Sequence, residues 1–577
     1  MTELNGTGLE QMQNEIEVFG LSLALSPAEF SELEELNLED LAGELIGFCI
    51  GRKVHNFSES NIQDFKNYVF KQQNSQISNF TPTSAKTFSR VSVPNNDDIL
   101  GVYGLTATPE VAFQPKAKSK KQSVSADKQL GLSPAPAEPN SGYATRIKPG
   151  TVVAEYGNQN ISWKSTSSKT VSVSVWDPDF MLQESNRFTY QKPSAAAAAI
   201  SDQIDELSQE IYNACCDPDV IDLVKLTYKG EDPVVICGQV VPPIDSDSVK
   251  PRVITLQGSL FTAKGATMSV DLSALENYSV FHGQIVVVEG SNPSGSLFLA
   301  TNLHGGVPKS MLTIPKPTKP AGELNIVVAA GPFTTSKNWA FEPLEDLAKY
   351  CLANDPDILL LTGPMIDVKH PLIEQLPTAF TFESLAQTVS RNLSAVLEGS
   401  GIKLILVSSA RDACLEGIYP TRRLPVLEDS EQFQTFPDPA ILKVDQLALG
   451  VTATDSLMHL GSAEDFHAPA GSSDRMGRLV EHLVCQKSFY PLRPSSEDLA
   501  IDVEATLRYA FMPICPNLLI LPSDMRFFIR DCGKTGPVCV NPGRLAKGTS
   551  GGTFGHLCIS AGDSKGQINV SGKIIRI

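Results

Sequence analysis

The stretch Ile326-Val327-Val328-Ala329-Ala330-Gly331-Pro332 sets the pattern for the second half of this 577-residue sequence. A brief aliphatic run that ends in a Gly-Pro turn is typical of a strand buried on both faces of a sheet. Four further runs follow: Ile358–Leu361, Leu404–Val407, Leu518–Leu521 and Val538–Val540. Helical patterns lie between them at Leu344–Leu352 and Phe382–Leu397. The alternation predicts a layered α/β domain over residues 320–577.

Residues 151–310 carry a different pattern, with short strands separated by Gly, Pro, Asn and Asp. Thr170–Val175 alternates with period two, as a half-buried strand does. The later strand candidates are Val234–Val241, Val253–Leu260, Ser269–Leu272, Gln284–Glu289 and Leu297–Thr301. Among them we expect a helix, capped by Ser194, that presents one apolar face formed by Ile200, Ile204, Leu207 and Ile211. This spacing favours a five-stranded OB barrel with a helical insertion.

The first 150 residues divide into two parts. Residues 1–75 contain apolar stripes at helical spacing, such as Leu38, Leu41 and Leu45, and a capping box that begins at Ser26. They predict a small helical bundle, which is either a purely structural module or a recruitment domain for other proteins. Residues 76–150 are dominated by Ser, Thr, Pro, Asn and Lys, so too little apolar surface can be buried to offset chain entropy. They predict a disordered linker.

The linker carries two kinds of candidate regulatory sequence. Four lysines form a basic run: Lys116, Lys118, Lys120 and Lys121. The run is either a nuclear-import signal or a solvated patch. Three hydroxyl residues precede a proline, which is the minimal pattern for a proline-directed kinase: Thr81, Thr108 and Ser133. Three such pairs in one exposed segment favour regulatory phosphorylation, so we expect a phosphoprotein.

The bulk composition argues against several classes of protein. With 47 Lys and Arg against 65 Asp and Glu, the net charge is −18, and self-sufficient binding of nucleic acid needs the opposite surplus. The 11 cysteines include no Cys-x-x-Cys pair, and Cys215 and Cys216 are adjacent, so we expect buried reduced thiols rather than a zinc site. No stretch approaches the roughly 18 apolar residues that cross a membrane, and Met1–Asn5 does not resemble the start of a secretory signal. We expect a soluble intracellular protein with protein partners and no membrane contact.

The strand-ending turns of residues 320–577 resemble, in order and spacing, those of the calcineurin-like metallophosphoesterases. Active members of that family hold two metal ions on strand-end loops, where the metals clamp a phosphate and generate hydroxide. The resemblance implies the ligand motifs Asp-x-His, Gly-Asp-x-x-Asp, Gly-Asn-His-Asp and Gly-His-x-His in that order. This sequence has, in their place, Ala330-Gly331-Pro332, Gly363-Pro364-Met365-Ile366-Asp367, Ser409-Ala410-Arg411-Asp412 and Pro522-Ser523-Asp524-Met525.

By this correspondence most ligand positions hold side chains that do not bind metals: Ala330, Pro332, Pro364, Ala410, Arg411, Ser523 and Met525. Asp367 and Asp412 keep a carboxylate. The five histidines of the region do not form the required pairs: His370, His459, His467, His482 and His556. The closing turn Asn541-Pro542-Gly543 keeps the family pattern. We expect an inactive phosphoesterase domain with no catalytic residue, no metal ion and no cofactor.

An OB barrel ahead of such a domain resembles the B subunits of the replicative DNA polymerases, and the N-terminal module with its long linker favours the alpha type. Three stretches are similar to the alpha type: Ala330–Ser336, Ser488–Leu492 and Val540–Leu545. The resemblance implies a non-catalytic nuclear scaffold that binds the zinc-containing C-terminal module of the DNA polymerase alpha catalytic subunit. It also implies a heterotetramer with both primase subunits, support for the initiation of DNA replication, and contact with DNA through the complex.

The segment Gly305–Gly322, which joins the predicted barrel to the predicted α/β domain, is short and contains four prolines: Pro308, Pro315, Pro317 and Pro320. Prolines stiffen a linker. We therefore expect the two domains to pack together and to grip one partner jointly.

Three alternatives stay open at this point. The chain is the B subunit of another replicative polymerase, or an active metal-dependent phosphoesterase, or an independent single-strand DNA-binding protein that uses the barrel. The second alternative needs ligands that the sequence lacks, and the net charge and the few aromatic residues in the barrel strands argue against the third.

Overall fold

The computed structural model describes residues 22–24, 56–58, 61–62, 65–66, 132–134, 141–165, 171–242, 252–316, 323–376, 380–426, 429–469, 474–532, 536–562 and 568–577. The chain forms two compact units, Met1–Asn96 and Asp97–Ile577.

In the first unit, two short strands pair in parallel, β1 (Ser22–Ala24) with β2 (Asn56–Ser58). Ile62 and Phe65 are helical and buried, and the Phe65 ring meets Phe57 edge to face with 5.8 Å between centroids. The apolar stripes of Leu38, Leu41 and Leu45, and the capping box at Ser26, lie outside the described residues. The strand pair was not predicted, because three-residue strands carry no legible periodicity.

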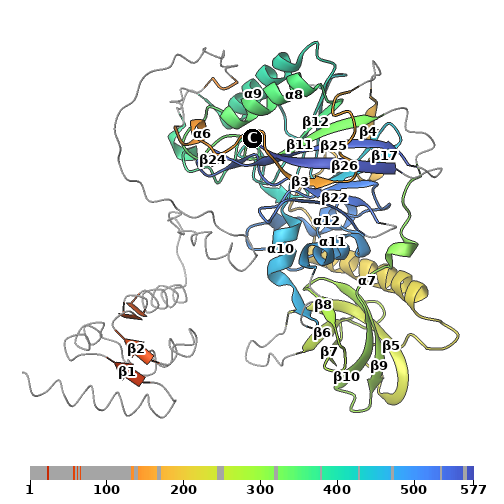
Figure 1. Ribbon diagram of the computed structural model, residues 1–577. Coiled ribbons are helices and arrows are strands. Elements are labelled where there is room, and N and C mark those ends of the chain that lie inside the picture. The colour runs from red at the N-terminus through yellow and green to blue at the C-terminus, as the bar shows by residue number, and fades with distance from the viewer. Residues whose placement is uncertain are drawn as a thin grey trace, which may run out of the picture. The chain divides into compact units, whose positions relative to one another are not determined.

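Two sheets form the centre of the second unit (Figure 1). The larger has the order β15 (Phe433–Phe436), β13 (Lys403–Val407), β12 (Ile358–Thr362), β11 (Leu324–Ala330), β25 (Thr553–Ala561), β26 (Ile568–Arg576), β3 (Val152–Tyr156). The smaller has the order β21 (Phe528–Asp531), β22 (Val538–Asn541), β20 (Leu518–Ile520), β17 (Leu447–Val451), β16 (Ala440–Val444), β4 (Val173–Val175). The five aliphatic runs predicted as buried strands all lie in these sheets, so the α/β prediction is confirmed; we call this part the two-sheet domain.

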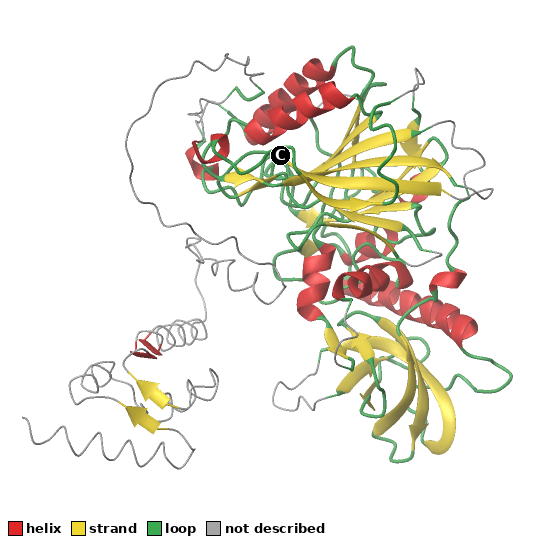
Figure 2. Cartoon of the chain, viewed as in Figure 1, coloured by secondary structure: helices red, strands yellow, loops and turns green. Residues whose placement is uncertain are grey.

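Helices and sheets form layers in the two-sheet domain (Figure 2). Helices α8 (Glu342–Asn354) and α9 (Phe382–Leu397) cover the outer face of the larger sheet, and α10 (Ser456–Ala463) and α11 (Arg475–Cys485) cover the outer face of the smaller one. In β11, Val327 packs under the helices while Val328 packs between the sheets, because successive side chains of a strand point to opposite faces. Within the described ranges, none of the helices has the length and apolar character needed to cross a membrane.

Short elements complete the second unit. They are the pair β14 (Ile418–Tyr419) and β19 (Ala500–Ile501), the pair β23 (Ala546–Lys547) and β24 (Ser550–Gly551), helix α12 (Val503–Tyr509), and the 3-10 turns η2 (Pro178–Phe180), η4 (Lys309–Met311) and η5 (Ile373–Gln375).

A closed barrel has the strand order β10-β7-β6-β5-β9. Its strands are β5 (Gly230–Val241), β6 (Val253–Gln257), β7 (Thr267–Asp271), β9 (Ile285–Asn292) and β10 (Leu297–His304), which confirms the five later strand predictions. Helix α7 (Pro193–Cys215) packs on the barrel through Ile204, Leu207 and Ile211. The prediction that Ser194 caps this helix is wrong. The cap is Lys192, because the fixed φ of Pro193 suits the first helical position.

The predicted start of the barrel domain at residue 151 is also wrong. Strand β3 pairs with β26 at the edge of the larger sheet, and β4, within the predicted strand Thr170–Val175, pairs with β16 at the edge of the smaller one. Period-two alternation indicates a strand but not its sheet, because the pairing partners lie hundreds of residues away. The two-sheet domain therefore includes chain on both sides of the barrel.

The end of the predicted linker is docked rather than disordered. Leu132 is fully buried in the core under α8 and α9; its N–H donates to Glu345 Oε1 at 3.4 Å, and its carbonyl accepts from Asn392 Nδ2 at 2.9 Å. A lone anchor of this kind has no periodicity that a sequence pattern can reveal. Thr81, Thr108 and the lysine run lie outside the described residues, whereas Ser133 is half-buried beside Leu132.

Helix α6 (Ser141–Ala144) provides a second anchor. Tyr143 Oη donates to Asp346 Oδ2 at 2.9 Å, and Arg146 Nη2 lies 2.5 Å from the same oxygen. The guanidinium of Arg146 also stacks on the Tyr143 ring, 4.0 Å from its centroid. The linker prediction is thus wrong for residues 132–134 and 141–150.

Candidate functional site

Six loops meet at one edge of the two-sheet domain. Strands β11, β12 and β13 run parallel to one another, and so do β17, β20 and β22, so the carboxyl ends within each set share an edge. Ligands of open α/β sheets bind outside such ends. We call these the strand-end loops, and they carry every position that the phosphoesterase resemblance assigned to a metal ligand.

The first two strand-end loops touch through their backbones. Gly331 N donates to Thr362 O at 2.8 Å, and a Cβ on Gly331 would lie 2.2 Å from Pro364 O, so only glycine fits. Ala330 and Pro364 are buried and Pro332 is half-buried. The loops approach each other as the resemblance implies, but these three side chains offer no atom that binds a metal.

Asp412 holds the backbone of the second loop. Its Oδ1 accepts from Met365 N at 2.5 Å and from Ile366 N at 3.3 Å, and its Oδ2 accepts from Ser409 N at 2.9 Å. A Cβ on Gly363 would lie 2.6 Å from Oδ2, which explains the glycine there. Burial raises the pKa of Asp412 to about 7, although the three N–H groups favour the ionised form. This carboxyl is occupied by backbone donors.

Asp367, the other retained carboxylate, is paired with a guanidinium. Arg411 Nη2 and Nε both donate to it, the latter at 3.2 Å to Oδ1, and Lys369 N donates to Oδ1 at 3.0 Å. A planar guanidinium binds a carboxylate through two parallel hydrogen bonds. The residue that replaces a predicted ligand thus supplies the positive charge that Asp367 faces, while Ala410 supplies no polar side chain.

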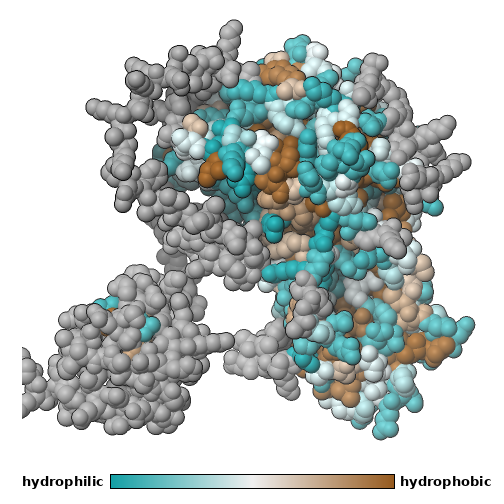
Figure 3. Space-filling model, in the orientation of Figure 1, coloured by the Kyte–Doolittle hydropathy of each residue, from teal (hydrophilic) through white to brown (hydrophobic). Residues whose placement is uncertain are grey.

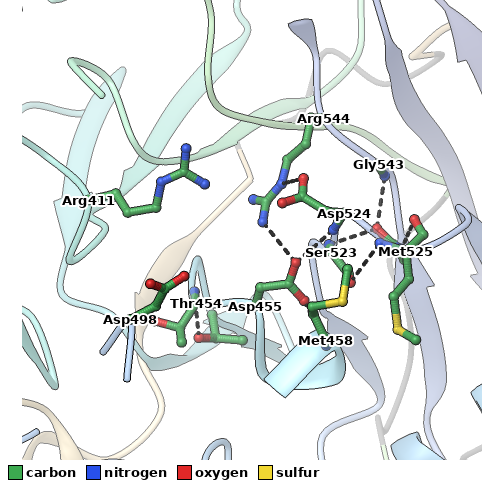
Figure 4. A network of polar contacts seen from close by, with 12 residues as sticks. Arg411, Thr454, Asp455, Met458, Asp498, Ser523, Asp524, Met525, Gly543 and Arg544 are labelled. Carbon is green, nitrogen blue, oxygen red and sulfur yellow. Dashed lines mark hydrogen bonds and ion pairs between the residues drawn. The ribbon is translucent and has the colours of Figure 1, made fainter. Parts of the chain in front are cut away.

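A second arginine of the strand-end loops, Arg544, lies beside Asp524 and Asp455, as Figure 4 shows. The Arg544 side chain is 4% exposed and lies between two carboxylates, with Nε 3.0 Å from Asp524 Oδ1 and Nη2 3.2 Å from Asp455 Oδ2. Asp455 also caps α10 by accepting from Met458 N at 3.0 Å. Arg544 lowers the pKa of Asp524 below its ordinary value. A fixed guanidinium charge therefore balances these acids.

The late loop and the closing turn form a structural clamp. Asn541 Oδ1 accepts from Ser523 N at 3.0 Å and from Gly543 N at 2.9 Å, while its Nδ2 donates to Met525 O at 3.3 Å. Ser523 and Met525 are buried, and Met525 packs in the core beneath α10 and α11. Gly543 has a φ of +74°, which suits glycine. These contacts account for the family-like Asn-Pro-Gly turn without any metal ligand.

The five histidines of the region are dispersed among separate partners. His370 contacts Thr335 O, His459 contacts Tyr490, His467 contacts Arg252, His482 contacts Ser279, and His556 contacts Tyr350. Burial lowers the pKa of His370, His459 and His556. The strand-end loops do not gather them as a metal site would require.

A second feature is the joint between the barrel and the two-sheet domain. Strand β8 (Tyr278–Val280), at the barrel, pairs with β18 (Asp465–His467) of the two-sheet domain. Gln486 completes the joint: its Oε1 accepts from Ile285 N at 3.0 Å, and its Nε2 donates to Ile285 O at 2.8 Å and Gly305 O at 2.9 Å. The prediction that the two domains pack together is confirmed.

Glu464 is the charged centre of the joint. Its side chain is 3% exposed; Arg478 Nε lies 2.5 Å from Oε1, and Ser279 Oγ donates to the same oxygen at 2.7 Å. Burial opposes ionisation, but hydrogen bonds from His482, Arg478 and Ser279 outweigh it and lower the pKa of Glu464 to about 2. The joint is therefore held by an ionised, fully partnered carboxylate.

Comparison with known proteins shows which protein family has this architecture. The family model for the B subunit of DNA polymerases alpha and epsilon matches residues 326–530, and the model for the OB domain of the DNA polymerase alpha B subunit matches residues 197–306. The DNA polymerase alpha B subunit of Mus musculus is 32% identical over 610 residues, which cover 98% of this chain and 99% of the relative. The Rattus norvegicus protein of the same name is 30% identical over 608 residues, with the same coverage of both chains. The Drosophila melanogaster protein of that name is 38% identical over 300 residues, which cover 51% of this chain and 46% of the relative.

This chain belongs to the family of DNA polymerase alpha B subunits. It is therefore a DNA polymerase alpha accessory subunit, with an OB domain and a phosphoesterase-like domain that correspond to the barrel and the two-sheet domain. The resemblance to the alpha type is confirmed.

Sequence reasoning about this polymerase alpha accessory chain missed two members of the strand-end network, Arg544 and Asp455. Arg544 directly follows the Asn541-Pro542-Gly543 turn, and Asp455 ends the loop after an aliphatic run, Leu447–Val451. The available signal was their place after a buried strand. Arg544 cannot bind a metal, and Asp455 lies outside the four ligand motifs that the resemblance implies, so neither residue was identified.

Proposed function

We propose that this polymerase alpha accessory subunit is a non-catalytic nuclear scaffold. Its barrel and two-sheet domain act as one body that binds the C-terminal zinc-binding module of the polymerase alpha catalytic subunit. The body works in a heterotetramer with both primase subunits, supports the initiation of DNA replication and meets DNA through the complex.

The pairing of Asp367 with Arg411 carries the non-catalytic part of the proposal. A two-metal phosphoesterase needs free carboxylates and imidazoles at the strand ends. Here Asp367 faces a guanidinium and Asp412 faces three backbone N–H groups. A metal ion would have to displace both sets of partners, and neighbouring positions such as Ala330 and Pro364 would give it no further ligand.

The joint and the surface support the partner-binding part of the proposal. Obligate interfaces commonly bury more than about 2,000 Å² in total, and a two-domain body held together at the joint offers a broad surface. Figure 3 shows apolar patches among polar ones on the face it draws, over both parts of this body. Large apolar side chains that stay exposed include Tyr190, Val220, Phe261 and Met311.

Co-expression with the C-terminal module of the catalytic subunit tests this proposal. Residues 97–577 should co-purify with the module as the full chain does, and residues 1–96 should not. Glu464→Gln, which weakens the joint, should reduce the yield of complex. Glu481→Gln is the matched control, because that glutamate is 47% exposed and pairs only at the surface with Lys309. Binding by residues 1–96 alone, or binding that requires DNA, would contradict the proposal.

We further propose that the N-terminal unit recruits other replication factors, and that phosphates on Thr81, Thr108 and Ser133 and the run Lys116–Lys121 regulate recruitment and nuclear import. Ser133 differs from the other two sites because it adjoins the buried Leu132 anchor. A phosphate adds about −1.5 to −2 charges, close to the Glu345 carboxylate that accepts from Leu132 N. Phosphorylation there should loosen the anchor.

Limited proteolysis and cell-cycle timing test the regulatory part. Ser133→Glu should speed cleavage around residues 135–140, whereas Ser133→Ala, the matched control, should not. Replacing all three hydroxyl residues by Ala should alter cell-cycle behaviour. Normal timing in that triple variant would refute the regulatory role.

A further inference from the structure

Three side chains of different chemistry converge at one end of the barrel. His304 Nε2 lies 2.6 Å from Glu289 Oε1, and Cys216 Sγ lies 3.7 Å from the same oxygen. One ligand atom from each of these residues lies within 4.8 Å of the other two. Among the residues that the structure describes, they form the one such group of His, Cys, Asp and Glu. We call this group the barrel triad.

The chain builds the barrel triad from three separate elements. Cys216 is the C-cap of α7, Glu289 lies in β9, and His304 is the last residue of β10. The antiparallel pairing of β9 with β10 shifts register between Ala300 and Asn302, and such a bulge re-aims the side chains that follow it. The helix end and the hairpin are thus brought together by the packing of α7 on the barrel.

The spacing of the triad suits a small tetrahedral cation. Zinc binds Cys sulfur at about 2.3 Å and His nitrogen or carboxylate oxygen at about 2.0–2.2 Å, so tetrahedral ligands lie roughly 3.3–3.6 Å apart. The sulfur–oxygen separation of 3.7 Å already has this size. The nitrogen–oxygen separation of 2.6 Å is that of a hydrogen bond and must widen by less than about 1 Å.

The hydrogen-bond partners of Glu289 favour the binding of a cation from solution at the triad. In the described parts of the chain, no Lys or Arg forms an ion pair with Glu289, whose partners are His304, Asn302 and the Cys216 thiol. Asn302 Nδ2 donates to Glu289 Oε1 at 3.3 Å and so orients the carboxylate from outside the triad. Exposures of 16% for His304 and 25% for Glu289 leave a path for the ion.

Without a cation the thiol stays protonated, because burial and the Glu289 charge raise the pKa of Cys216 to about 11. A bound divalent ion reverses this balance, since a coordinating thiol loses its proton outright. The thiol proton passes to solvent as the sulfur–metal bond forms, and no oxidation is involved.

We propose that Cys216, Glu289 and His304 bind one Zn²⁺ ion, which ties the end of α7 to the β9–β10 hairpin. Water completes the coordination. The mixed sulfur, nitrogen and oxygen set is one that zinc accepts and that Mg²⁺ and Ca²⁺ do not favour. The sequence-based expectation of no metal rested on the strand-end positions and on Cys-x-x-Cys spacing, and a site assembled across three elements has neither signature.

Titration of the metal-stripped full chain with Zn²⁺ alone tests the site. One equivalent should bind against a chromophoric chelator. Cys216→Ser and His304→Gln should each lower the affinity by more than about tenfold, since even outer-shell changes cost 10–100-fold. Cys414→Ser is the matched control, a half-buried thiol of the two-sheet domain, and should bind as the native chain does.

Cobalt gives a second measurement, whose main result comes from the native chain alone. Co²⁺ bound to the native chain should show thiolate-to-metal charge-transfer absorption, which Cys216→Ser should lose and Asp367→Asn should retain. The proposal is overturned if the native chain binds no zinc, if Cys216→Ser binds it undiminished, or if the cobalt complex shows no thiolate band.

Discussion

The strand-end loops and the barrel triad both contain carboxylates, several in the loops and one in the triad, but they differ in what faces those carboxylates. In the strand-end loops, Arg411 and Arg544 supply fixed positive charges to Asp367, Asp455 and Asp524. In the triad, Glu289 faces a histidine, an amide and a thiol. A carboxylate with a guanidinium partner inside the chain has little to gain from a metal ion, whereas Glu289, which has no Lys or Arg partner among the described residues, has more to gain. The difference teaches that the region resembling a metalloenzyme is the less suited of the two to bind metal.

The largest effect should come from removing the buried guanidinium of the strand-end loops. Arg544→Met leaves Asp455 without its cation in a site where the arginine is 4% exposed. Breaking a buried pair by removing one partner typically costs about 3–5 kcal/mol. Urea unfolding should report a loss of this order. Lys547→Met is the control, since Lys547 is an exposed cation on the neighbouring strand β23, and equal losses in both variants would contradict the account.

The joint carboxylate should behave like a strand-end one, because it too has an arginine partner. The lowered pKa of Glu464, about 2 against an ordinary 4.5, corresponds to roughly 3 kcal/mol of stability. Since the folded-state pKa is depressed, this stabilisation is complete above pH 4.5 and is lost as the pH falls toward 2. Glu464→Gln should therefore lose about this much at pH 7 and almost nothing near pH 2. A loss that is the same at both pH values would contradict the electrostatic reason.

Asp412 should show the opposite pH dependence, because its pKa is raised to about 7. The folded chain then holds a proton that the unfolded chain releases above about pH 4, so stability from this group is present at low pH and is lost as the pH rises to 7. The slope in that window approaches about 1.4 kcal/mol per pH unit. Asp412→Asn, which does not ionise, should lack this slope in unfolding measurements from pH 4 to 7; an unchanged slope would assign it to another group.

The smallest effects are expected at the Arg411–Asp367 pair, whose guanidinium is partly exposed, and in catalysis. Arg411 is 31% exposed although Asp367 is only 8% exposed, so water can partly replace the guanidinium, and Arg411→Gln should cost about 1–2 kcal/mol, less than Arg544→Met. The native chain, given Mn²⁺, should hydrolyse a phosphodiester no faster than a buffer blank, and Asp367→Asn should leave that rate unchanged. Two bound metal equivalents with activity that Asp367→Asn removes would overturn the comparison between the two regions.

Local sequence patterns predicted those parts of the fold whose signal is local. The aliphatic runs became strands of the two sheets, five short runs became the barrel, and Phe382–Leu397 became α9 with the same bounds. Long-range pairing was not predictable: β4 alternates as a barrel strand would, yet it pairs with β16. Isolated anchors could not be predicted either, because the burial of Leu132 depends on a core that α8 and α9 form.

For the strand-end loops, sequence order identified the positions but not their replacement chemistry. Arg411 was placed as a lost ligand, and its pairing with Asp367 became evident only in three dimensions. The role of Arg544 was not predicted, because its partners Asp455 and Asp524 come from different loops. The barrel triad was invisible for the same reason: Cys216, Glu289 and His304 are far apart in sequence and share no motif.

Strand β26 has a consequence for how the protein is made. It lies between β25 and β3, so the larger sheet joins Val152–Tyr156 to Ile568–Arg576, across more than four hundred residues of intervening chain. During synthesis the barrel strands, which pair among themselves, leave the ribosome well before β26 does. The barrel can therefore fold early, while β3 and β4 wait as unpaired edges that are prone to misassociation. A break in translation between residues 304 and 568 leaves a protein with a finished barrel and an open sheet, which is a substrate for chaperones rather than a shorter working form of the protein.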